Sequence, residues 1–344
     1  DRVEWRYAAD GESGLPESPD QPGEDDEQDW TEIGSAASSN VTKAPTPTGK
    51  VEEAWSIELM DPSNFLPVSE PVVAGGKIFI AVGNRLMSLS ADDRSVEASV
   101  SLSSSIDYTC RPSVSQGVLY VPLSSGVVEA YLLPTLTRLW TSESTARADQ
   151  SSCSLTIMEK DGMSIVVYGT AAFGSAGYSS GSCVALDAQT GERVWIASLD
   201  DAGYYWTGAV QLNGFVVVGD TAGRLHAFDI TTGEEQDCLA LGSSISADAV
   251  VYNNTILIVT RGGVLHKIRV DANGELVSVA QQQVLGSCMA APTVVGSTAV
   301  LCGTAVGSSN ATALVLVNLE TFKVEQTITQ ADGIALPQGG SAAS

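Results

Sequence analysis

The chain is poor in basic residues and in histidine, and it has no long apolar run. Only 17 Lys and Arg stand against 41 Asp and Glu, which gives a formal net charge of −24. A surface of this charge repels phosphate backbones and anionic lipids, so we expect neither nucleic acid nor a membrane surface as a partner. No apolar stretch reaches about 18 residues, so we expect no membrane-spanning helix.

Cysteines are few and scattered, at positions 110, 153, 183, 238, 288 and 302. With no C-x-x-C pair and only two histidines, a zinc site is hard to assemble from this sequence. Cys110, Cys153 and Cys288 each precede the first strand of a repeat, and equivalent positions in successive repeats are spatial neighbours. We therefore predict a Cys110–Cys153 disulfide, worth about 2–4 kcal/mol. The alternative is buried free thiols that pack as small apolar groups.

What the chain does have is an internal repeat. A strand that ends in a residue such as Asp187 or Asp229 is followed by a turn and a second strand, most clearly in ALDAQTGERVW at 185–195. Equivalent positions are 90, 132, 187, 229, 269 and 318, which are 42, 55, 42, 40 and 49 residues apart. A period of roughly 40 to 50 residues is typical of propellers and other repeat folds.

Each repeat is predicted to contain four short strands separated by Gly, Asn-Gly and Thr-Gly turns, and helical periodicity is absent over any useful length. The Asp at the start of each third-strand turn is expected to cap that turn with its side chain. These patterns predict an all-β fold, a β-propeller of four-stranded blades closed around an axis.

The strand at 51–59 aligns with 191–199, Trp55 on Trp195, so we expect this first strand to complete the last blade from outside. Six repeats and this shared blade predict seven blades, with eight as the alternative. The tail after Asp332 is too short to supply the inner strands, so the C-terminal blade is expected to be incomplete.

Residues 1–29 form an expected acidic, Pro/Gly-rich linker or arm, in which only 3–7 has the composition of a strand, and residues 30–344 form the propeller. The chain starts at Asp1 without Met or an apolar leader, which suggests an excised or processed segment whose signal is not shown. Acidity, few Lys and the predicted disulfide favour an exported protein at the cell surface.

The sequence ALDAQTGERVW at 185–195 resembles the repeat of the PQQ-like propellers, the quinoprotein alcohol dehydrogenase-like superfamily. TPT at 46–48, AW at 54–55 and YYWTGA at 204–209 are similar to its surface-exposed bacterial branch. The resemblance covers about residues 30–335. Members include quinone-dependent dehydrogenases, an outer-membrane barrel-assembly lipoprotein and cell-surface proteins without a known reaction, so it implies a fold more firmly than a function.

The resemblance also implies what a quinone enzyme needs: a disulfide of adjacent cysteines, a Trp beneath the quinone, and calcium held by Glu, Asn and Asp. Here no two cysteines are adjacent, and no carboxylate-rich segment matches that pattern. No G-x-S-x-G motif or phosphate-binding glycine loop occurs in a suitable setting. We therefore expect no enzyme activity and no pyrroloquinoline quinone.

The candidate binding site is an insertion of about 13 residues around 173–182, because repeat folds place binding surfaces in such insertions. With the connection at 200–206 it offers aromatic side chains for a sugar or an extended peptide: Phe173, Tyr178, Tyr204, Tyr205 and Trp206. Asp200 and Asp201 could ligate calcium through oxygen. The alternative is that Tyr205 and Trp206 pack one end of a blade. Whether the insertion and the connection share a face depends on strand parity, which the sequence leaves open.

His226 and His266 occupy equivalent places in successive third strands, where the family commonly has an aromatic residue packed between blades. Core packing is the favoured interpretation, and a metal or acid–base pair is the alternative. The sequence as a whole predicts a non-catalytic extracellular propeller that binds a glycan or a protein, as a monomeric module of a larger chain. An envelope assembly scaffold is the alternative, and a quinone-dependent dehydrogenase is the third reading.

Overall fold

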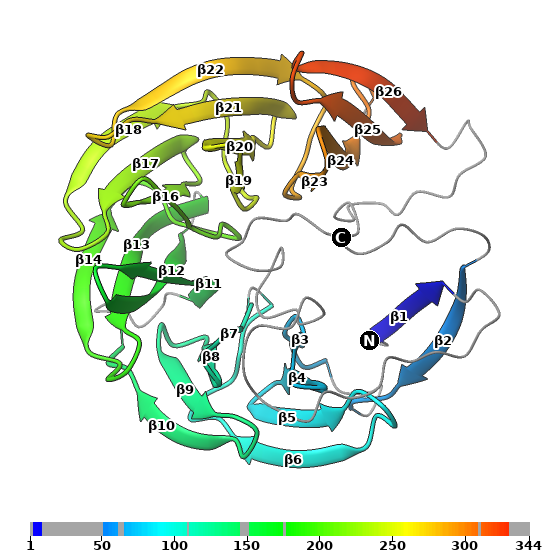
Figure 1. The fold of residues 1–344 in the computed structure, drawn as a ribbon, viewed down its shortest axis with the longest axis vertical. Coiled ribbons are helices and arrows are strands. Elements are labelled where there is room, and N and C mark those ends of the chain that lie inside the picture. Colours follow the sequence, from blue (N-terminus) through cyan, green and yellow to red (C-terminus); the bar gives the residue numbers. More distant parts are fainter. Residues whose placement is uncertain are drawn as a thin grey trace.

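The computed structural model describes residues 3–8, 51–60, 65–108, 110–144, 151–174, 177–308 and 311–329. Its described residues form an all-β ring of six four-stranded antiparallel sheets, with a two-stranded sheet beside them (Figure 1). In each four-stranded sheet consecutive strands are neighbours, and the first strand lies nearest the axis (Figure 1). The predicted all-β propeller of four-stranded blades is confirmed.

We number the six sheets as blades one to six in chain order. Blades one to three contain β3 (Val72–Ala74), β4 (Lys77–Val82), β5 (Arg85–Ser90) and β6 (Val96–Ser101); β7 (Ser113–Ser115), β8 (Val118–Pro122), β9 (Val128–Leu132) and β10 (Thr137–Thr141); and β11 (Ser151–Lys160), β12 (Met163–Gly174), β13 (Gly177–Asp187) and β14 (Arg193–Leu199).

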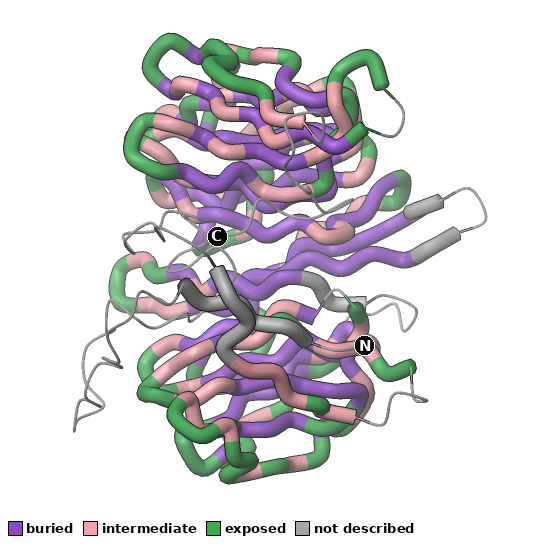
Figure 2. The backbone as a smooth tube through the Cα atoms, turned by 90° about the vertical axis from the view of Figure 1, so that its right-hand side faces the viewer, coloured by how far each residue is buried: buried purple, intermediate pink, exposed green. Residues whose placement is uncertain are grey.

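Blades four to six contain β15 (Val210–Leu212), β16 (Phe215–Gly219), β17 (Arg224–Asp229) and β18 (Glu235–Ala240); β19 (Val250–Tyr252), β20 (Thr255–Val259), β21 (Val264–Val270) and β22 (Leu276–Gln283); and β23 (Thr293–Val295), β24 (Thr298–Thr304), β25 (Thr312–Asn318) and β26 (Lys323–Thr329). In blade four the second and third strands are almost wholly buried, whereas the residues of the fourth strand are exposed or half-buried. In Figure 2 the exposed residues lie mainly at the turns.

A β-bulge between the third and fourth strands recurs at the same place in all six blades. The register shifts opposite Ser88/Leu89, Ala227/Phe228 and the equivalent pairs of the other blades. The aligned positions of the repeat each lie two residues after the first member of such a pair: 90, 132, 187, 229, 269 and 318. The predicted alignment of the repeats is therefore confirmed by their backbone geometry.

In five of the six blades the turn that follows the bulge is capped by a side chain, most clearly by the predicted Asp in blades three and four. Asp187 Oδ1 accepts the backbone N–H groups of Gln189 and Thr190 at 2.9 and 2.8 Å. Asp229, Ser90 and Asn318 make the same pair of bonds in their own blades. In blade five the cap shifts along the chain to Asp271, because Arg269 has no acceptor to offer.

Tryptophans in the fourth strands join successive blades. Trp195 of blade three lies against the turn of blade four, where its ring leaves no room for a Cβ on Gly233, and its indole N–H donates to the carbonyl of Ile230 at 2.9 Å. Trp140 of blade two packs in the same way on Gly191 of blade three. The repeated Trp of the sequence motif is thus an inter-blade contact.

The two-stranded sheet consists of β1 (Val3–Ala8) and β2 (Val51–Ile57), which pair antiparallel and lie between blade six and blade one (Figure 1). The guanidinium of Arg94, in the turn of blade one, lies 4.9 Å from the Trp55 ring. Trp55 therefore contacts the next blade as Trp140 and Trp195 do, which supports its predicted place in an outer strand at the join.

The partner of β2 is β1, in the one part of residues 1–29 that has the composition of a strand. The rest of the expected arm, and the tail after Thr329, lie outside the described residues. The count of seven blades stays a prediction.

Candidate functional site

The described connections between blades lie on one face of the ring. In an antiparallel four-stranded sheet the second and fourth strands run in the same direction, so the turn after the second strand and the connection after the fourth share an edge. Hydrogen bonds confirm this: Thr221 N–H donates to Gly203 O, and Ser124 N–H donates to Ser105 O, both at 2.9 Å. We call this edge the connection face.

The described part of the connection face comprises the inter-blade connections 58–60, 65–71, 102–108, 110–112, 142–144, 200–209, 241–249 and 284–292, with the turns 83–84, 123–127, 220–223, 260–263 and 305–308. The strand order also answers whether the insertion of blade three and the 200–206 connection share a face, which the sequence left open. The insertion of blade three lengthens the hairpin of β12 and β13, whose tip pairs Gly174 with Gly177 at the same edge as the 200–209 connection.

The most exposed large apolar side chains gather on the connection face. Phe65 is 82% exposed, Tyr108 66% and Val306 62%, and these are the highest values among the large apolar side chains described. Leu66 and Met289 add to them. The remaining exposed apolar residues occupy outer strands or the opposite edge, and each is less exposed than Phe65, Tyr108 and Val306. Exposed apolar surface concentrated on one face is typical of a surface that binds a partner.

An ion-pair cluster of Glu70, Arg111 and Asp248 lies on the same face. Arg111 donates through Nη1 to Asp248 Oδ2 at 3.0 Å and to Ser154 Oγ at 3.1 Å, and its Nε lies 3.2 Å from Glu70 Oε1. Glu70, Arg111 and Asp248 each stand two residues before the innermost strand of their blade. The bonds between Arg111 and Asp248 therefore join blades two and five across the axis.

Asp248 is the most constrained member of the cluster. Its side chain is 7% exposed, and it also accepts the backbone N–H of Gly208, where a Cβ would lie 2.5 Å from Asp248 Oδ1. Burial raises the pKa of Asp248 above its usual value, and the bonds from Arg111, Gly208 and Ser154 lower it only in part. Glycine at 208 is thus required by the close approach of this carboxylate.

The predicted aromatic site is only partly gathered. Tyr204 is fully buried, with its hydroxyl among the buried polar atoms that have no hydrogen-bond partner and its ring edge-on to His226. Tyr205 and Trp206 are half-buried and stack with ring centroids 5.1 Å apart, with Trp206 at a φ of 58°. The side chains of Phe173 and Tyr178 lie outside the described residues. Tyr204 is therefore a core residue, and the other assignments stay predictions.

The predicted calcium ligand Asp201 is engaged by a cation of the chain itself. Arg224 forms a two-pronged ion pair with it, Nη2 to Oδ1 at 2.8 Å and Nη1 to Oδ2 at 3.0 Å. Bonding to Arg224 lowers the pKa of Asp201. A calcium ion would have to compete with the guanidinium at Asp201, and calcium binding there stays a prediction.

The cysteines are mostly buried. Cys110 is one of them, and burial raises the pKa of its thiol well above the usual value. The side chain of Cys153 lies outside the described residues, so the Cys110–Cys153 disulfide stays a prediction. Cys238 is exposed.

The two histidines have different surroundings although they occupy equivalent strands. Both are buried, as core packing requires. Neither ring nitrogen of His266 has a hydrogen-bond partner, and burial lowers its pKa. His226 is bonded through both nitrogens, Nδ1 to Glu235 at 2.6 Å and Nε2 to Asp220 at 3.1 Å. Only His266 is thus a purely core histidine.

Two small cavities in the described part of the chain measure about 10 and 20 Å³, one beside Tyr168 and the other between Trp55 and Leu89. Each is about large enough for one water molecule. The described residues contain no helix with the length and apolarity needed to cross a membrane.

The family model of the outer membrane protein assembly factor BamB matches residues 37–204 and 179–334, which is most of the chain. The chain therefore belongs to this family of PQQ-like β-propeller repeat proteins, as the sequence motif predicted. No curated protein matches it in sequence.

Solved structures similar to this chain include two quinohemoprotein alcohol dehydrogenases. The enzyme from Comamonas testosteroni is 12% identical, with a TM-score of 0.61 over 88% of this chain and 67% of the enzyme. The enzyme ADHIIG from Pseudomonas putida HK5 is 14% identical, with a TM-score of 0.61 over 85% of this chain and 57% of its own.

A chain of the mitotic checkpoint complex is 12% identical, with a TM-score of 0.53 over 74% of this chain and 78% of its own. Identities this low show a shared fold, which proteins of unrelated activity also use.

Proposed function

We propose that this chain is a non-catalytic scaffold that binds a partner protein through its connection face. The observation that carries the proposal is the gathering of Phe65, Tyr108 and Val306, the most exposed large apolar side chains described, on that one face. Aromatic and apolar groups of this kind are the common anchors of protein interfaces. The matched family is named for outer membrane protein assembly, which supports a protein partner and an exported location.

The charge of the face indicates what kind of partner segment fits. Its described connections and turns contain six acidic side chains that are at least partly exposed and two basic ones: Glu58, Glu70, Asp107, Glu143, Asp200 and Asp201 against Arg111 and Arg261. A basic segment with aromatic or aliphatic side chains would be complementary in charge and in surface. A glycan remains the competing ligand class, since the stacked Tyr205 and Trp206 offer aromatic surface.

The residues around the axis do not fit a quinone and its calcium ion. The carboxylates of Glu70 and Asp248 both contact the guanidinium of Arg111, so a divalent cation placed between them would meet a fixed positive charge. The adjacent cysteines that the resemblance requires are absent from the sequence. The proposal therefore contains no quinone chemistry.

The experiment is native co-purification of the full-length protein, as wild type and as matched surface variants. Phe65→Glu combined with Tyr108→Glu places charges on the connection face, and Leu139→Glu combined with Val279→Glu places them on outer strands. We expect a defined partner with the wild type and the outer-strand variant, and its loss with the connection-face variant.

Equal retention of the partner by both variants would contradict the proposal. Thermal stabilisation by an oligosaccharide, lost in Trp206→Ala, would instead favour glycan binding.

A further inference from the structure

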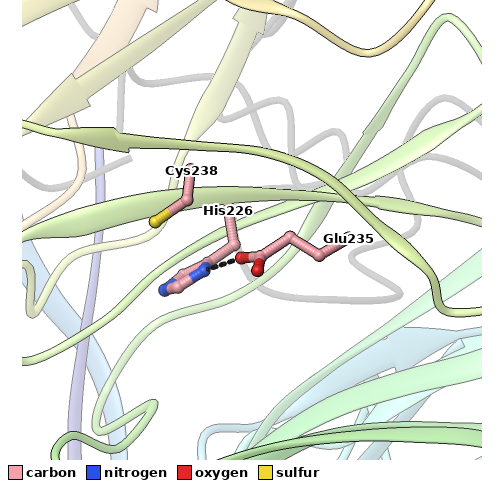
Figure 3. Close-up of side chains that lie close together, drawn as sticks. All are labelled: His226, Glu235 and Cys238. Carbon is pink, nitrogen blue, oxygen red and sulfur yellow. Dashed lines mark hydrogen bonds and ion pairs between the residues drawn. The ribbon is translucent and has the colours of Figure 1, made fainter.

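Three side chains of metal-binding type meet on blade four. His226 of β17 and Glu235 and Cys238 of β18 place an imidazole nitrogen, a carboxylate oxygen and a thiol sulfur all within 4.8 Å of one another (Figure 3). The imidazole is buried, whereas Glu235 and Cys238 are exposed. The group therefore has a fixed interior ligand and two side chains that can adjust from the solvent side.

Strand pairing explains why residues so far apart in sequence meet. His226 lies directly opposite Cys238 in the β17–β18 ladder, and paired residues point to the same side of the sheet. The bulge at Ala227/Phe228 then brings Glu235 opposite Phe228. The Phe228 ring stacks on that of His226, so Glu235 lies on the same side of the sheet as His226. The same bulge that defines the repeat thus assembles the cluster.

The far side of the imidazole is held in the way that metal-binding histidines require. His226 Nε2 lies 3.1 Å from Asp220 Oδ2, and Asp220 is itself fully buried. Asp220 accepts the backbone N–H and the Nε–H of Arg224 at 2.8 and 2.6 Å, and Arg224 is tied in turn to Asp201. A carboxylate that accepts the second ring N–H fixes the orientation of a ligand histidine and raises its basicity.

We propose that His226 Nδ1, Glu235 and Cys238 bind a zinc-like divalent cation, with Asp220 and Arg224 as the supporting layer. Thiolate, imidazole and carboxylate are the ligand types that zinc takes in proteins. The ion replaces the proton between Nδ1 and Glu235 and that of the Cys238 thiol, and both protons pass to solvent.

Metal binding at this site requires little movement of the three ligand side chains. Ligand atoms about 2.0–2.3 Å from a tetrahedral ion are about 3.5 Å apart. Rotation of the exposed Cys238 and Glu235 side chains is enough to reach this spacing from within 4.8 Å. Three protein ligands leave a fourth position, on the side where Glu235 and Cys238 face solvent, for water or for a group from another molecule.

The test is titration of the reduced, metal-free full chain with Co²⁺, which reports thiolate ligation by a sulfur-to-cobalt charge-transfer band in the near ultraviolet. We expect the band to saturate at one equivalent and to disappear when Zn²⁺ is added. Cys238→Ser should abolish it, and Glu235→Gln should weaken binding at least about 10-fold. Glu234→Gln, on the neighbouring exposed residue, is the matched control and should bind as the wild type does.

Retention of the band in Cys238→Ser would overturn the proposal, since another thiol would then be the ligand. Absence of the band in the wild type would overturn it equally. Far-ultraviolet circular dichroism of each variant shows whether the fold is retained, and the exposed positions of Cys238 and Glu235 lead us to expect that it is.

Discussion

The contact between Trp195 and Gly233 predicts a strong coupling between two substitutions. Gly233 has a φ of 71°, and a Cβ placed on it would lie 2.6 Å from Cγ and Cδ2 of Trp195. Gly233→Ala should therefore cost about 1–2 kcal/mol for the left-handed backbone and about 1–3 kcal/mol more for the clash. Trp195→Ala alone should cost about 3–5 kcal/mol, because the ring is buried.

In the Trp195→Ala background the clash is gone, so Gly233→Ala should cost only the backbone part, about 1–2 kcal/mol. Gly162→Ala is the matched control, since Gly162 has a φ of 81° and no atom within 4 Å of its Cβ position. Urea unfolding followed by circular dichroism gives each free energy. If Gly233→Ala costs the same with and without the Trp195 ring, the inter-blade contact does not have the role we give it.

Two further predictions concern buried charge and thiol exposure. Arg111→Gln leaves Asp248 buried without its cation, so it should cost about 3–5 kcal/mol at neutral pH. Because the folded-state pKa of Asp248 is raised, its proton is held more tightly in the folded than in the unfolded state. The contribution of Asp248 to the free energy of unfolding therefore falls as pH rises from 3.8, the usual pKa of this carboxyl, through its pKa in the folded state. The deficit of Arg111→Gln should accordingly be smaller in acid than at neutral pH, and thermal unfolding of both proteins across pH checks the sign; a deficit independent of pH would contradict it. Among Cys110, Cys183, Cys238, Cys288 and Cys302, only Cys238 should react with iodoacetamide in the native chain, and peptide mass spectrometry would contradict this if a buried cysteine were modified first.

Much of the fold could be predicted because its signal is local. Asp187, Gly191 and Trp195 lie within one turn and the strand after it, and each has a role in that unit or against the next blade. The aligned positions from 90 to 318 fall at the same bulge in every blade. A repeat makes such local signals visible six times, which is why weak copies could be aligned with strong ones.

The candidate sites were harder to predict because they depend on pairing across strands and blades. Arg111 and Asp248 are separated by 137 residues and meet only because the ring closes around them. His226, Glu235 and Cys238 come together through one ladder register and one bulge, although the scarcity of histidine argued against a metal site. Tyr204 was expected to bind ligand and is buried instead, because the connection at 200–206 carries inward-facing and outward-facing residues in the same short segment.

The central claim, protein binding at the connection face, is tested most directly by site-specific photocrosslinking in cells that carry the full-length protein. A photoreactive amino acid at Phe65, Tyr108 or Val306 should give a discrete adduct with one partner protein, and the same group at Leu139 or Val279 on the outer strands should not. Adducts formed equally from both sets of positions, or from the outer strands alone, would contradict the claim.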